Sequence, residues 1–345
     1  YPSLAAVYAL YARAYLWLGG FEIGLYSDIP TGADAYRLAA EYARKAIAAS
    51  GKTPLTAEQW HDAKNGFNDG SSNNAWMWGL SLSVENASNI ITNIAHLAPE
   101  AIWGYSVLSL PSINKALYDL IDINDFRKKS WLDPEYTWNP SADTYNPNHG
   151  YQFAGNDDQV SGYESYGIKN AYEYFMAFTS PYVNLKFRPA GGQCVEYTEG
   201  NCADHLLMRV EEMYFIEMEA YAAMGNLGKA VELLNDFMKH RVTDGSYDCS
   251  LLATDFETFT DEMLLQKRAE FWGEGIVVYD YKRLDKGITR HYTDSNHPSI
   301  WQFNTEGRSP QWNLVINRGE YQSNIGIDES TNNPDPSGLL VVPKN

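Results

Sequence analysis

A repeated pair of helical segments constrains the fold of this chain more than any other feature. Six positions near the N-terminus recur at a constant offset: Tyr8, Leu10, Ala14, Tyr15, Leu18 and Gly19 match Tyr214, Ile216, Ala220, Tyr221, Met224 and Gly225. In both copies a second helical stretch follows, and a Gly marks the turn, which is typical of a tetratricopeptide-like helix pair. We predict helices over 3–18, 34–49, 207–224 and 227–240.

A fifth helix is predicted over 261–273. Thr260, Asp261 and Glu262 supply oxygens that suit the unpaired amides of a first turn, and Gly273 and Gly275 end the helical pattern. Together with the repeats, this helix indicates a mainly α fold.

Residues 51–203 differ from the repeats, since they are rich in Asn, Asp, Gly, Ser and Pro, with helical periodicity only near 111–122. Residues 76–82 are predicted as a short strand, and 133–165 as a long ordered loop or small hairpins. The expected organisation is a helix pair (1–50), a loop-rich insert (51–203), further helices (204–290) and an irregular C-terminal wrap (291–345), all in one unit.

The charge of the chain excludes several classes of partner. A formal net charge of −18 opposes binding to nucleic acid or to anionic lipid. No stretch approaches the roughly 20 apolar residues of a membrane span. Because the chain begins with Tyr1 rather than Met, we expect a processed or truncated product whose targeting segment or lipid anchor lies outside it.

Three cysteines are too few for a disulfide scaffold. Cys194 and Cys202 bracket a short polar loop that could close as a local disulfide, which would leave Cys249 over. Two reduced thiols remain an equally open alternative.

Motifs for nucleotide, serine-hydrolase and zinc chemistry are absent from the sequence. Glu270 and Glu274 have the spacing of one helix face and could approach as glycosidase carboxylates do. A structural role is the stronger interpretation, because cations lie nearby in sequence as ion-pair partners: Lys267, Arg268, Lys282 and Arg283. We therefore expect no enzymatic activity.

No cofactor is expected, although a structural calcium ion is an open alternative. Five carboxylates could supply oxygen ligands: Asp119, Asp122, Asp125, Asp157 and Asp158. Their spacing lacks the central Gly and closing Glu of an EF-hand loop, so a solvated acidic face is the preferred interpretation.

The chain contains 10 Trp and 25 Tyr, many of them in the polar insert. Indole and phenol rings stack on the C–H faces of sugars, and neighbouring amides and carboxylates bond the hydroxyls. Trp76 and Trp78 are assigned to the core. The predicted ligand-binding residues are Trp103, Tyr105, Trp138, Tyr145 and Tyr151.

The segment from Leu264 to Gly287, LLQKRAEFWGEGIVVYDYKRLDKG, resembles the "ERR-x-EF-x-x-EG-x-R-x-x-DL-x-RW" signature of the SusD/RagB family. It departs from that signature at Val278 and Leu284. The segments from Leu206 to Arg241 and from Ala6 to Gly19 resemble two further family helices, in the family's order.

The resemblance implies a SusD-like tetratricopeptide fold and a Bacteroidetes-type outer-membrane lipoprotein on the extracellular face. Its implied role is capture of oligosaccharide or polysaccharide, without catalysis, for a SusC-like TonB-dependent transporter. The membrane would be reached only through a lipid anchor absent from this chain, which resembles the family without its N-terminal part. The alternatives are a glycoside hydrolase using Glu270 and Glu274, or a helical-repeat protein-interaction adaptor.

Overall fold

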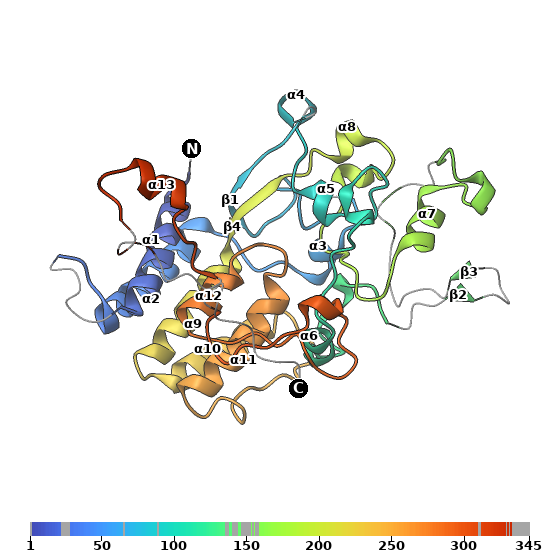
Figure 1. Cartoon of the computed structure of the whole chain (residues 1–345). Coiled ribbons are helices and arrows are strands. Elements are labelled where there is room, and N and C mark those ends of the chain that lie inside the picture. Colours follow the sequence, from blue (N-terminus) through green and yellow to red (C-terminus); the bar gives the residue numbers. More distant parts are fainter. Residues whose placement is uncertain are drawn as a thin grey trace. The chain divides into compact units, whose positions relative to one another are not determined.

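Helices dominate the chain, with short strands and long loops between them (Figure 1). The computed structural model describes residues 2–21, 28–64, 66–87, 90–134, 138–139, 144–145, 153, 155, 159–309, 312–328, 330 and 332. The chain divides into two units, Tyr1–Glu274 and Gly275–Asn345. The prediction of a mainly α fold is confirmed.

Both predicted helix pairs are present in the first unit. They are α1 (Leu4–Gly19) with α2 (Gly32–Ser50), and α9 (Val210–Ala223) with α10 (Leu227–Met238). Helix α2 packs against both α1 and α9, and α9 also packs against α10, so the pairs form one continuous stack. Buried alanines let α1 and α2 approach closely: Ala5, Ala6, Ala9 and Ala12 on one, and Ala35, Ala39, Ala40, Ala43 and Ala46 on the other.

The two repeated glycines serve different purposes at equivalent positions. Gly225 follows α9 with φ of 80°, a left-handed conformation that favours glycine. A Cβ on Gly19, by contrast, would lie 2.5 Å from the Tyr36 ring, so this glycine permits close contact between α1 and α2. The matching sequence pattern therefore has two physical causes.

Helix α11 (Phe256–Glu270) begins earlier than predicted. Asp255 forms its N-cap and accepts a hydrogen bond from the Thr258 amide at 2.8 Å, while Thr258 Oγ1 accepts one from the Asp255 amide at 3.0 Å. This capping box is a stronger start signal than the predicted one at Thr260, which lies one turn into the helix. The helix ends at Glu270, and Gly273 follows with φ of 78°.

The insert consists of short elements. Its helices are α3 (Ala57–His61), α4 (Val84–Ala87), α5 (Ile94–Leu97), α6 (Lys115–Leu120), α7 (Ala171–Phe178) and α8 (Tyr197–Gly200), with 3-10 turns η1 (Tyr105–Val107), η2 (Phe126–Ser130), η3 (Glu164–Tyr166) and η4 (Ala190–Gly192). Strand β1 (Trp76–Leu80) pairs antiparallel with β4 (His205–Arg209), and β2 (Trp138–Asn139) pairs with β3 (Thr144–Tyr145). The predicted strand and the helix near 111–122 are confirmed, while α7 was not predicted. The β2–β3 pairing agrees with the small hairpins offered for 133–165, but more than half of that range lies outside the described residues.

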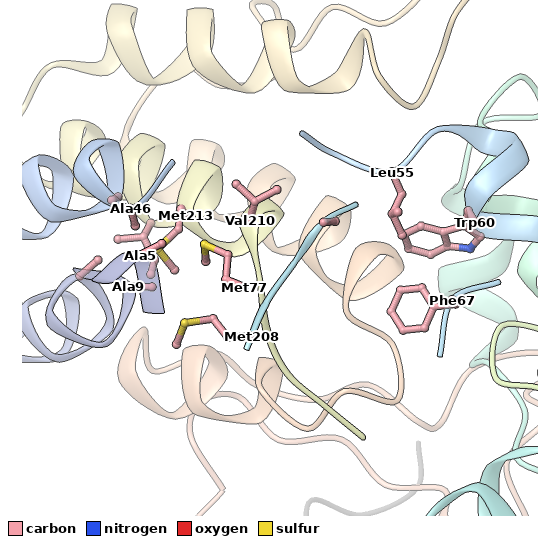
Figure 2. Close-up of a cluster of buried hydrophobic side chains, with 14 of the residues drawn as sticks. Ala5, Ala9, Ala46, Leu55, Trp60, Phe67, Met77, Met208, Val210 and Met213 are labelled. Atoms are coloured by element: carbon pink, nitrogen blue, oxygen red, sulfur yellow. The ribbon is translucent and has the colours of Figure 1, made fainter. Parts of the chain in front are cut away.

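The β1–β4 pair lies against the helical stack. Figure 2 shows Met77 and Met208 of these strands near Met213, Ala5 and Ala9 of the helices. A second group in the same cluster contains Leu55, Trp60 and Phe67. Trp76 is buried and Trp78 is half-buried against this cluster, so their assignment to the core is confirmed.

The second unit contains α12 (Val277–Arg283), η5 (Ser299–Trp301) and α13 (Arg318–Ser323), separated by irregular chain. A bridge between Thr289 and Asn304 and a hydrogen bond from the Arg308 amide to Asp285 Oδ1 at 3.0 Å hold its loops.

Candidate functional site

Eight buried charged side chains form what we term the central charge cluster. Its cations are Arg127, Lys186, Arg209 and Arg241, and its carboxylates are Asp125, Glu211, Glu270 and Glu274. None of these side chains is more than 8% exposed, and their formal charges sum to zero. They come from η2, β4, α9, α11 and the loops between, so the cluster joins distant segments of the first unit.

Glu270 lies at the centre of the cluster. Its oxygens accept hydrogen bonds from Arg241 at 2.7 and 2.8 Å and from Arg209 at 2.6 Å. Arg127 donates to the same carboxylate at 3.0 Å. Burial opposes ionisation, but the charges of Arg241 and Arg209 outweigh it and hold the pKa of Glu270 well below its ordinary value.

Glu274 pairs with Lys186, whose Nζ lies 2.6 Å from Oε1, and with Arg209, whose Nε lies 3.0 Å from Oε2. Burial lowers the pKa of Lys186 to about 8. Aromatic faces complete the surroundings: the Lys186 ammonium lies 4.3 Å from the centre of the Phe67 ring, and the Arg209 guanidinium lies 4.3 Å from that of Phe271.

Glu270 and Glu274 therefore have the geometry of structural ion-pair residues and not that of catalytic carboxylates. Glu270 has no exposed surface, so a sugar cannot reach it, and the hydrolase alternative that relied on it is not supported. The cations seen to pair with Glu270 and Glu274 come from remote segments of the chain. Arg283 instead pairs with Asp280 at 3.1 Å, and Lys282 donates to the Trp312 carbonyl at 3.3 Å.

The carboxylates considered as calcium ligands have other contacts. Asp119 pairs with Lys115 at 2.6 Å, Asp122 accepts a hydrogen bond from the Asn124 amide, and Asp125 belongs to the central charge cluster. Asp157 and Asp158 lie outside the described residues. Within the described ranges, no group of three His, Cys, Asp or Glu side chains is placed to hold a metal ion.

Trp103 is half-buried and packs against the main core cluster. Its indole N–H donates to the Gln193 carbonyl at 3.0 Å, and its ring meets the Tyr197 ring edge-on at 5.5 Å. Trp103 therefore anchors the insert and has only part of its ring available to a ligand.

Tyr105, two residues later, has a different environment. Its side chain is 46% exposed, and its ring stacks on exposed His96, with the ring centres 5.2 Å apart and the planes 19° apart. Such a stacked pair at the surface offers a ring edge and hydroxyl to a polar ligand with apolar faces. We term Trp103, Tyr105, His96 and Tyr197 the aromatic site.

Two of the remaining predicted residues, Trp138 and Tyr145, belong to β2 and β3. They are direct partners across this strand pair, although their side chains lie outside the described part of the chain, as does Tyr151. The sequence did not single out His96 or Tyr197, since a lone His or Tyr in a loop gives no signal of its own. Cys194 is buried, and no disulfide joins it to Cys202.

Comparison with known proteins gives consistent results. The model of the SusD family matches residues 114–325. No curated protein is significantly similar in sequence. Within the described residues, no helix combines the length and apolar character needed to cross a membrane.

Three solved structures share the fold. A SusD-like carbohydrate binding protein from Bacteroides vulgatus is 19% identical with a TM-score of 0.57, and the match covers 94% of this chain and 58% of that one. A SusD superfamily protein from Bacteroides thetaiotaomicron is 19% identical with a TM-score of 0.58, and the match covers 97% of this chain and 61% of that one. A SusD superfamily protein from Parabacteroides distasonis is 16% identical with a TM-score of 0.59, and the match covers 94% of this chain and 62% of that one. The chain thus spans about three-fifths of their length. Because the family match covers more than half of the chain and includes the segment around Glu270, we conclude that the chain belongs to the SusD family.

Proposed function

We propose that this protein binds an extracellular oligosaccharide or polysaccharide without cleaving it and delivers it to a SusC-like TonB-dependent transporter. Its place would be the extracellular face of the outer membrane, held by a lipid anchor. Membership in the SusD family supports a role in glycan binding and uptake. The single observation that carries the proposal is the exposed Tyr105 ring, stacked on His96 beside half-buried Trp103.

The burial of Glu270 and Glu274 supports the absence of catalysis in this proposal. The acid pair that sequence reasoning offered for hydrolysis is buried among arginines, where no substrate can reach it. Binding through a few rings is weak for each sugar, so we expect affinities in roughly the micromolar range or poorer, rising when a polymer engages several sites.

Titration calorimetry with a panel of oligosaccharides tests the proposal, with a reducing-end assay on every ligand that binds. Tyr105→Ala should weaken binding by about two- to tenfold, because an aromatic stacking contact contributes roughly 0.5–1.5 kcal/mol. Tyr11→Ala is a matched control, since Tyr11 is 48% exposed and lies on α1.

Two outcomes would overturn the proposal. Release of reducing ends would establish a hydrolase. Absence of affinity for every sugar would favour the helical-repeat adaptor.

A further inference from the structure

A polar cavity lies beside the β1–β4 pair, separate from the residues of the aromatic site. Its volume is about 250 Å³, and four stretches line it: the loop after α3, Ser81 and Leu82 after β1, residues 188–191, and residues 202–204 before β4. This volume suits a single sugar ring.

Hydrogen bonds between the walls hold the cavity in shape. Asp204 accepts from the Gly70 amide and from the Leu82 amide, both at 2.8 Å, which fixes three of the lining stretches together. Asn68 donates to the Arg188 carbonyl at 2.8 Å and accepts from the Arg188 amide at 3.1 Å, which fixes the fourth. Preformed walls reduce the ordering cost of binding.

The charges around the cavity include no excess of cations. Lys64 and Arg188 line it together with Asp69 and Asp204, and Arg188 pairs with buried Glu100 at 3.4 Å, so the formal charges of these five residues sum to −1. Burial disfavours ionisation of Asp69, but hydrogen bonds from Ser71 and Ser72 outweigh it and lower the pKa, so this carboxylate is ionised at neutral pH. An anionic ligand would find no excess cation here.

The lining therefore combines polar residues of both charges and small apolar surfaces without an excess of cations. Sugar hydroxyls can donate and accept at once, which suits a lining that holds both basic and acidic residues. Leu82 and Pro189 offer apolar contact for C–H groups.

We propose that this cavity binds one neutral sugar residue. We expect a polysaccharide to place one ring in it, at a chain end or on a short branch. This inference rests on the proposed function and adds to it the class of sugar and the part of the glycan that is recognised.

Cys202 provides a built-in reporter, because its side chain lines the cavity and is half-buried. Its Sγ donates to the Thr198 carbonyl at 3.2 Å, and burial raises the pKa of the thiol. Cys194 and Cys249 are both buried, so Cys202 should be the fastest of the three to react with a thiol reagent at mildly alkaline pH.

The experiment measures the rate of Cys202 modification by a disulfide reagent, alone and with millimolar D-glucose, D-galactose, D-mannose, L-fucose or N-acetylglucosamine. We expect at least one of these neutral sugars to slow the reaction severalfold, and D-glucuronate to leave it unchanged. The variant Cys202→Ser should lose this reaction, which identifies Cys202 as the thiol that is modified. If no neutral sugar slows the reaction, or if only D-glucuronate does, the inference is wrong.

A cavity-filling variant gives an independent test. Ser81→Phe places a ring in the cavity, whereas Ser83→Phe makes the same change at an exposed position that does not line it. Sugar affinity measured by calorimetry should fall at least tenfold in the first variant and stay unchanged in the second. Oligosaccharide binding that responds to Tyr105→Ala but not to Ser81→Phe would overturn the cavity site alone. Absence of all sugar binding would overturn the proposed function as well.

Discussion

Arg241 binds both carboxylate oxygens of Glu270, with Nε 2.7 Å from Oε2 and Nη2 2.8 Å from Oε1. Two parallel charge-assisted hydrogen bonds fix the position of both side chains. Since neither side chain has exposed surface, water cannot replace either partner if the other is removed.

Glu270→Gln should therefore lower the free energy of unfolding by about 3–5 kcal/mol, because it leaves buried cations without their central partner. Urea denaturation measures the change. Glu232→Gln is the control, since Glu232 pairs with Lys229 at the surface and should change stability by less than about 1 kcal/mol. A loss below about 1 kcal/mol in Glu270→Gln would contradict the structural role assigned to this residue.

His61 should make the protein sensitive to acid. Burial lowers its pKa from 6.5 to about 4, and its Nε2 lies 2.8 Å from the Phe126 carbonyl, to which the neutral ring donates. As the pH falls below 6.5 the unfolded chain binds a proton here before the folded chain does, so stability present above 6.5 is lost towards pH 4. The expected loss is on the order of 3 kcal/mol.

The variant His61→Gln separates this contribution from other acid effects, because a glutamine amide can still donate a hydrogen bond but does not titrate. Unfolding curves across the same pH window should show a shallower decline for the variant than for the natural chain. Equal slopes would mean that His61 takes up its proton in the folded protein as readily as in the unfolded one.

Gly19 and Gly228 should respond in opposite directions to replacement by alanine. A Cβ at Gly19 would lie 2.5 Å from the Tyr36 ring, so Gly19→Ala should destabilise by about 1–3 kcal/mol. At Gly228, in α10, a Cβ meets nothing within 4 Å, so Gly228→Ala should stabilise the protein by up to about 1 kcal/mol. Thermal and urea unfolding measure both changes, and destabilisation by Gly228→Ala would contradict this account.

Replacement of Trp103 should mainly lower stability, whereas replacement of Tyr105 should mainly weaken sugar binding. Trp103→Phe removes the donor to the Gln193 carbonyl and should lower the free energy of unfolding by about 1 kcal/mol, with a smaller effect on sugar affinity than Tyr105→Ala. Tyr105→Ala should leave stability almost unchanged, because its ring is exposed. Unfolding curves and calorimetry on both variants measure the two effects. If Tyr105→Ala lowered stability and Trp103→Phe weakened sugar binding more, the roles assigned to the two residues would be excluded.

The helical part of the fold was predictable because its periodicity is local. The repeats over α1, α2, α9 and α10 lie within a few residues of the predicted ranges. The start of α11 was missed because the capping box at Asp255 and Thr258 precedes the acidic residues on which the prediction relied. Helix α7 was missed because it has only eight residues, which is too short to establish a period.

The site was less predictable, since its contacts join remote segments. Glu270 was correctly given a structural role, but its partners Arg127 and Arg209 lie far from it in sequence, and no local pattern points to them. For the aromatic residues, ring type alone cannot distinguish exposed Tyr105 from half-buried Trp103.

The central charge cluster also affects when the first unit can finish folding. Its four cations and two of its carboxylates precede Glu270 and Glu274, which are the last members to be synthesised. A nascent chain that ends before α11 is complete would have to bury two positive charges in excess, which is strongly unfavourable. Incomplete chains should therefore stay open and accessible to proteases until the short segment from Glu270 to Glu274 has been added.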